Sequence, residues 1–137
     1  MIRELVSQWE KNKDKLEEYF KKTNQSEYSS SYKQILLKIF ELCLHNADEY
    51  CGFDLSKMTV IDDGEYQGCQ IFIIPKDKYQ PGVDDYVITH THYGSCSGCD
   101  TLQGISWYED GLPNDEQVRD YMTLSLHLVQ RLKWLSD

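Results

Sequence analysis

The sequence predicts an α+β domain in the order α-α-β-β-β-α, in which two N-terminal helices and one C-terminal helix accompany a three-stranded antiparallel meander. Apolar residues recur at three- and four-residue steps near both ends of the chain, which is typical of helices. The middle alternates instead and is rich in β-branched and aromatic residues, and its three strand-like runs are joined by short connections. The length of 137 residues fits a single domain, residues 1–137.

The first two elements are predicted to be amphipathic helices. The apolar face of the first consists of Ile2, Leu5, Val6, Trp9, Leu16, Tyr19 and Phe20. Polar residues 23–30 then predict a loop. Ser31 is the expected N-cap of the second helix, with Gln34 as its capping-box partner, and this helix should end before Gly52.

Three strands are predicted at residues 58–62, 68–75 and 86–93. The Asp-Asp-Gly-Glu sequence at 62–65 is a hairpin turn signal between the first two. The loop at residues 76–85 carries a Pro-Gly turn dipeptide before the third strand. We therefore expect an antiparallel meander in which neighbours in sequence are neighbours in the sheet.

The last predicted helix opens at Asn114, whose side chain should cap it while Gln117 reaches back. Its inner stripe is expected to comprise Val118, Tyr121, Met122, Ser125, Leu128, Val129, Leu132 and Leu135. Residues 102–107 fit either a helical turn or an additional strand, and the pattern does not choose between them.

The net charge of −9 is concentrated in the second part of the chain. Residues 51–137 carry 6 Lys or Arg against 14 Asp or Glu, whereas residues 1–50 carry 8 against 9. Such a surface repels nucleic-acid phosphates, so we expect no direct binding of nucleic acid. It would attract a protein with a basic surface, although it also fits simple solubility.

No apolar run approaches the roughly 20 residues that span a bilayer, so no membrane partner is expected. The first ten residues lack the features of a signal peptide, and we expect the protein in the cytoplasm. Five cysteines are an odd number, which argues against a disulfide framework and favours reduced thiols or a metal.

Residues 90–100, His-Thr-His-Tyr-Gly-Ser-Cys-Ser-Gly-Cys-Asp, are the densest concentration of chemically versatile side chains. In a meander the first hairpin turn and the end of the third strand meet at one end of the sheet. We therefore expect Cys69 to pair near Thr91 or His92. The side chains predicted to gather there are Asp62, Asp63, Glu65, Cys69, His92, Cys96, Cys99 and Asp100.

This composite site has four interpretations, and the sequence leaves all of them open. The pair Cys96 and Cys99 has zinc-ligand spacing, and Cys69 and His92 would complete four ligands, so the cofactor is either none or zinc. The same pair could act as a redox dithiol. A cysteine with His90 or His92 could form a hydrolytic or transferase site. Alternatively, the small residues simply build a compact turn.

Aromatic residues beside acids form a second pattern. Such loops suit recognition of a protein with basic patches, because tyrosine and tryptophan are enriched at binding hot spots. They also suit ordinary loop packing. The loop residues concerned are Tyr66, Tyr79, Trp107 and Tyr108, beside Glu65, Asp77, Glu109 and Asp110.

The string Tyr-Gly-Ser-Cys-Ser-Gly-Cys-Asp-Thr-Leu-Gln at residues 93–103 resembles that of a group of small uncharacterised proteins encoded by bacteriophages and prophages of Gram-positive bacteria. Upstream Ile-Pro at 74–75, Tyr-Gln-Pro at 79–81 and Asp-Asp-Tyr at 84–86 extend the resemblance over residues 65–105. The resemblance implies a phage product acting inside a bacterium. By that setting, it implies an inhibitor of host machinery or of host defence, such as an anti-CRISPR protein.

The leading hypothesis is a non-enzymatic binding protein that acts on a host protein through an acidic, aromatic surface. The residues expected to contact the partner are Asp62, Asp63, Glu65, Tyr66, Trp107, Tyr108, Glu109 and Asp110. The alternative is a small metal- or thiol-dependent enzyme that uses Cys96, Cys99 and His92.

Overall fold

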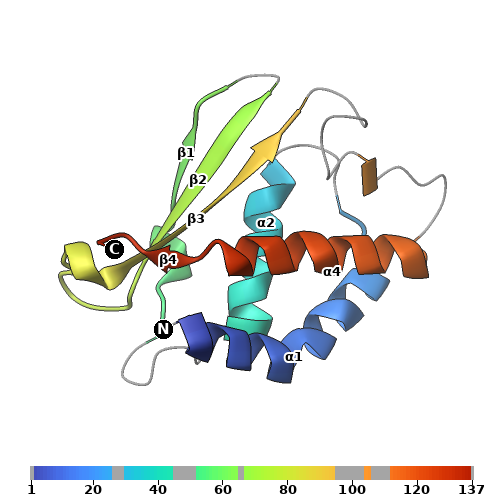
Figure 1. Cartoon of the computed structure of the whole chain (residues 1–137), viewed down its shortest axis with the longest axis horizontal. Coiled ribbons are helices and arrows are strands. Elements are labelled where there is room, and N and C mark those ends of the chain that lie inside the picture. Colours follow the sequence, from blue (N-terminus) through green and yellow to red (C-terminus); the bar gives the residue numbers. More distant parts are fainter. Residues whose placement is uncertain are drawn as a thin grey trace.

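The computed structural model describes six segments of the chain: residues 2–25, 30–44, 52–64, 67–94, 104–105 and 112–136. They form an α+β arrangement in which helices accompany an antiparallel sheet (Figure 1). The predicted class is therefore confirmed. The described sheet has four strands rather than the three predicted.

Helices α1 (Ile2–Lys22) and α2 (Ser30–Ile39) form as the apolar spacing predicts, and α2 continues into a π-helical turn, η1 (Phe40–Leu44). The helix α2 begins at Ser30, so Ser31 lies inside its first turn and is not the N-cap that the sequence predicted. The buried apolar face of α1 is also narrower than the sequence predicted. Val6 is 48% exposed, whereas the other described members of that face are buried or half-buried.

The strands are β1 (Thr59–Asp62), β2 (Gly68–Pro75), β3 (Tyr86–Tyr93) and β4 (Lys133–Trp134), in the spatial order β1-β2-β3-β4. The first three match the prediction except that β1 begins one residue after Met58. A short 3₁₀ turn precedes β1 and uses Met58 as its C-cap.

The end of the chain differs from the prediction. Helix α4 (Asp115–Gln130) has the predicted capping box, in which the Asn114 side chain accepts from the Gln117 N–H at 2.8 Å. It ends at Gln130, however, and the following residues form β4 beside β3, where the Leu135 N–H donates to the Tyr86 carbonyl at 2.8 Å. Leu132 and Leu135 are therefore not part of the helix.

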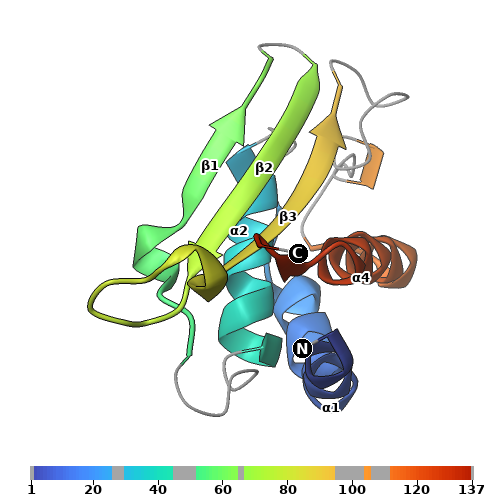
Figure 2. The same ribbon diagram turned by 60° about the vertical axis from the view of Figure 1, so that its left-hand side comes forward.

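All three helices lie on one side of the sheet (Figure 2). Side chains alternate along a strand, so Phe72 and Ile74 of β2 and Val87 of β3 are buried against the helices. On this inner face the Thr89 hydroxyl donates to the Leu128 carbonyl at 2.8 Å, which ties β3 to α4. The opposite, outer face carries half-exposed residues such as Ile71 and is not covered by any described helix.

None of the helices in the described segments is long and apolar enough to cross a membrane. Within residues 102–107 the structure describes only 104–105, which are helical, and the Gln117 side chain donates to the Ile105 carbonyl at 3.1 Å.

Candidate functional site

The turn after β1 and the end of β3 meet at the same end of the sheet, as predicted. Cys69 pairs directly with His92 across β2 and β3, and Asp62 pairs with Gln70 across β1 and β2. The register that the sequence predicted is therefore confirmed. The described members of the composite site are Asp62, Asp63, Cys69 and His92.

The Asp62 carboxylate is fully engaged within the hairpin. It accepts hydrogen bonds from the Tyr93 hydroxyl, from the Gly64 N–H at 3.0 Å and from the Gln70 side-chain amide at 3.2 Å. The bond from Tyr93 is the main cause that holds the pKa of Asp62 below its ordinary value, and it raises the pKa of Tyr93 to about 12. Asp62 is thus charged and Tyr93 neutral over the whole physiological range.

Asp63 organises the other side of the turn. Its carboxylate accepts from the Cys69 N–H at 2.6 Å, while its own N–H donates to the Cys69 carbonyl at 3.2 Å. Glycine is needed on both flanks. A Cβ at Gly68 would lie 2.6 Å from the Asp63 carboxylate, and one at Gly64 would lie 2.0 Å from the Gln67 carbonyl oxygen. Both aspartates therefore serve to fix the turn itself.

Alternation along the strands divides the predicted site between two faces. Asp62 is paired with Gln70 and bonded to Tyr93, both of which are buried on the inner face. Cys69 and His92 belong to the outer face, because each is one residue removed from an inner-face position. For the described residues, the predicted end of the sheet is confirmed, but the prediction did not separate Asp62 from the thiol of Cys69 and the imidazole of His92.

The two strand histidines lie side by side on the outer face. The ring centroids of His90 and His92 are 5.8 Å apart. Burial, and then the positive charge of Arg131, lowers the pKa of His90. His90 is therefore an uncharged imidazole at neutral pH, a form able to accept a hydrogen bond or bind a metal.

The metal prediction keeps only two of its four ligands within the described segments. Cys69 and His92 are neighbours, but the described residues contain no group of three His, Cys, Asp or Glu side chains that could hold an ion. Cys96 and Cys99 lie outside the described residues, as do Glu65, Tyr66, Trp107, Tyr108, Glu109 and Asp110 of the predicted partner surface.

Both described thiols, those of Cys43 and Cys69, are protonated at neutral pH. Burial raises the pKa of Cys43 to about 11. Burial, and then the charge of Asp63, raises the pKa of Cys69 above 9.0. Neither is activated as a nucleophile, because the thiolate is the reactive form.

We expect slow alkylation of Cys69 by iodoacetamide at pH 7, where roughly one per cent or less of such a thiol is ionised. The rate should rise with pH to beyond pH 9, because the raised pKa moves formation of the thiolate upward. Mass spectrometry of the labelled peptides at a series of pH values measures this, with buried Cys43 as the slower internal control. Rapid labelling of Cys69 below pH 7 would contradict the assignment.

Sequence reasoning did not place Arg131 and Lys133 beside the sheet, and it did not establish how exposed Tyr79 is. Arg131 and Lys133 lie beside the outer face because β4 forms there, whereas a helix was predicted over this segment. Tyr79 was recognised as a loop aromatic, but only the structure shows that it is 94% exposed. The Pro-Gly dipeptide that follows it is the sequence signal that could have given Tyr79 greater weight.

Comparison with known proteins finds no protein-family model, no curated protein and no solved structure that matches this chain.

Proposed function

We propose that this chain is a small acidic binding protein that acts on another protein with a basic surface. The proposed setting is the one implied by the phage resemblance: an inhibitor of host machinery or of host defence that acts in the bacterial cytoplasm. The net charge of −9 supports a basic partner. The described residues supply no activated thiol and no metal-binding cluster, so the binding role is favoured over an enzymatic one.

The exposure of Tyr79 is the observation that carries the proposal. Its side chain is 94% exposed, in the loop between β2 and β3. Asp77 and Asp84 of the same loop are also exposed, and neither forms an ion pair with another described residue. An aromatic ring flanked by free carboxylates is the composition expected for contact with a basic protein surface.

Hydrogen bonds to Asp85 hold the loop that carries this ring. The Asp85 carboxylate accepts from the Gly82 N–H at 2.9 Å and from the Lys78 ammonium at 3.0 Å. The Asp85 backbone carbonyl accepts from the Lys76 N–H at 2.8 Å. The two bonds to the carboxylate hold the pKa of Asp85 below its ordinary value, the Gly82 N–H being the main cause. Presenting an aromatic side chain from a preorganised loop reduces the entropy lost on binding.

We expect Tyr79→Ala to weaken partner binding by at least about tenfold, as removal of an interface hot spot does. Asp84→Lys should weaken it as well, whereas Asp14→Lys on the exposed face of α1 makes the same change of charge and should have little effect. Tagged protein is incubated with lysate of a Gram-positive bacterium, and the retained protein is identified and quantified by mass spectrometry.

A basic protein retained in equimolar amount, and released by salt, is the expected result. Equal retention by wild type, Tyr79→Ala and Asp84→Lys would exclude this loop as the contact. Reversal of the predicted residues Glu109 and Asp110 then tests the other acidic surface, since Asp62 and Asp63 hold the turn after β1 and their reversal would disturb the fold. Failure of all variants to alter binding would overturn the proposal.

A second candidate function is a small metal- or thiol-dependent enzyme, and the pairing of Cys69 with His92 is the observation that favours it. These two side chains share the outer face at the end of the strand that leads into Cys96 and Cys99. Elemental analysis of untagged protein distinguishes the two functions. Stoichiometric zinc that is lost in Cys96→Ser and Cys99→Ser would favour the metal site.

A further inference from the structure

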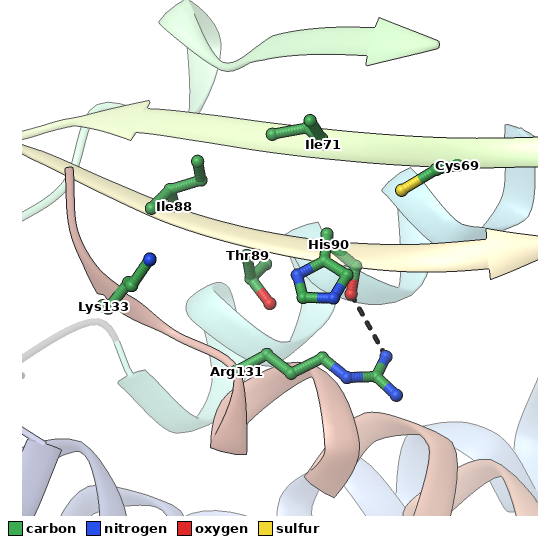
Figure 3. Close-up of a pocket in the computed structure, with 7 residues that line it drawn as sticks. All are labelled: Cys69, Ile71, Ile88, Thr89, His90, Arg131 and Lys133. Atoms are coloured by element: carbon green, nitrogen blue, oxygen red, sulfur yellow. Dashed lines mark hydrogen bonds between the residues drawn. The ribbon is translucent and has the colours of Figure 1, made fainter. Parts of the chain in front are cut away.

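The outer face of the sheet contains a depression of about 460 Å³, and none of the described residues that line it belongs to the loop of Tyr79 at residues 76–85. Side chains from β2, from β3 and from the segment that follows α4 surround it (Figure 3). The residues that line it are Cys69, Ile71, Ile88, Thr89, His90, Arg131 and Lys133. A volume of this size lies in the range that small-molecule sites occupy.

The lining combines an apolar floor with cations on one side. Half-exposed Ile71 and Ile88 provide the floor, and Figure 3 shows Arg131 and Lys133 along the same side of it. Among the described residues, no carboxylate lines the depression, and neither cation forms an ion pair with any of them. In a chain with net charge −9, two cations that have no ion-pair partner among the described residues form a locally basic edge beside apolar surface.

A side-chain hydrogen bond places Arg131 beside the depression, and strand pairing places Lys133 there. The Arg131 guanidinium donates one hydrogen bond to the His90 carbonyl at 3.2 Å, which holds the side chain against β3 (Figure 3). Its other N–H donors stay available, because a guanidinium has five. Lys133 is the direct β-ladder partner of Ile88, so its backbone is fixed beside the apolar floor and its side chain leaves the strand on the same face as Ile88.

We propose that this depression binds a small amphipathic carboxylate. The carboxylate contacts Lys133 beside Ile88, Arg131 adds positive charge farther along the same side, and the hydrocarbon body covers Ile71 and Ile88 (Figure 3). A guanidinium and an ammonium together favour an anion, and charge-assisted hydrogen bonds to a carboxylate are among the stronger polar contacts in proteins. Because the cations lie on one side only, the site selects a ligand that is anionic at one end and apolar at the other. This ligand site is separate from the proposed protein-binding loop.

The test compares three ligands that share one hydrocarbon chain: octanoate, octanol and octylammonium. Titrations below the micellar range are followed by NMR of the isoleucine methyl groups. We expect saturable octanoate binding that shifts Ile71 and Ile88, and binding of octanol and octylammonium that is at least about tenfold weaker. Octanoate affinity should also fall as salt is added.

Variants then identify the contacts. Lys133→Gln should weaken octanoate binding by about tenfold, since it removes one charge-assisted contact. Lys133→Arg should retain binding. Lys11→Gln on α1 removes the same charge elsewhere and should leave the affinity unchanged. Ile71→Thr, which keeps a β-branched residue in the strand, should weaken the binding of all three ligands to a similar extent.

Octanoate that binds no more tightly than octanol, or that binds equally to wild type and Lys133→Gln, would overturn the proposal. Thermal melts of each variant establish that the fold is retained, and substitutions of solvent-exposed Lys133 are not expected to unfold it. Because the protein-capture experiment depends on Tyr79, failure of one proposal leaves the other intact.

Discussion

Phe20→Ala should lower the free energy of unfolding by about 3–5 kcal/mol, the usual result of truncating a buried phenylalanine. Phe20 is 0% exposed and stacks on Tyr121 with ring centroids 5.1 Å apart and an interplanar angle of 19°. This pair joins α1 to α4, so its removal leaves a cavity between the two helices that are farthest apart in sequence. Urea denaturation followed by circular dichroism measures the loss.

Tyr19→Ala is the matched control, because Tyr19 is the neighbouring aromatic residue on the same helix. Its ring is only half-buried and lies under the Lys38 ammonium at 5.3 Å. We expect a smaller loss for this variant, since solvent can fill the space that the ring leaves. If Tyr19→Ala destabilised the protein as much as Phe20→Ala, the described packing of α1 against α4 would be wrong.

Asp62→Ala should lower the free energy of unfolding by about 1–2 kcal/mol at neutral pH, because it leaves two donors on the inner face without their acceptor. These donors are the Tyr93 hydroxyl and the Gln70 side-chain amide, and both residues are buried. This value is the lower part of the range of about 1–3 kcal/mol that an unsatisfied buried donor costs. The lower part applies because the Asp62 side chain is exposed to solvent. Asp120→Ala removes the same charge from the exposed face of α4 and should have little effect.

The pH dependence of the difference between wild type and Asp62→Ala tests the same contact. The pKa of Asp62 is lowered on folding, so the contribution of its charge is complete above the ordinary value of 3.8 and is lost as the pH falls through the folded pKa. The pKa of Tyr93 is raised, so its contribution is complete below 10.0 and is lost as the pH rises toward about 12. We therefore expect a constant difference from pH 5 to 9. A difference that grew on acidification would contradict this assignment.

The strand register could be predicted from sequence because it rests on local signals. The turn at residues 62–65 and the alternation of β2 and β3 together define which residues face each other, and Cys69 pairs with His92 as expected. The capping box at Asn114 was equally local, since both partners lie within one helical turn.

The remaining features depend on contacts between distant segments. Leu128, Leu132 and Leu135 recur at three- and four-residue steps, so the periodicity favours a helix to the end. The two residues of β4 are too few to show alternation, and only the free edge of β3 makes them a strand. Arg131 and Lys133 could not be placed for the same reason, and with them the depression on the outer face was not foreseen.

Strand β1 has a consequence for how the molecule behaves at high concentration. It is one of the two edge strands of the described sheet, it spans four residues, and it ends at Asp62, which Asp63 follows directly. A second molecule that paired its own β1 with this edge would bring like charges together. The short length of β1 and the charge of its aspartates therefore disfavour pairing between the sheets of two molecules. The lowered pKa of Asp62 keeps its charge in place at neutral and mildly acidic pH, which matters because Ile61 on the same strand is 48% exposed.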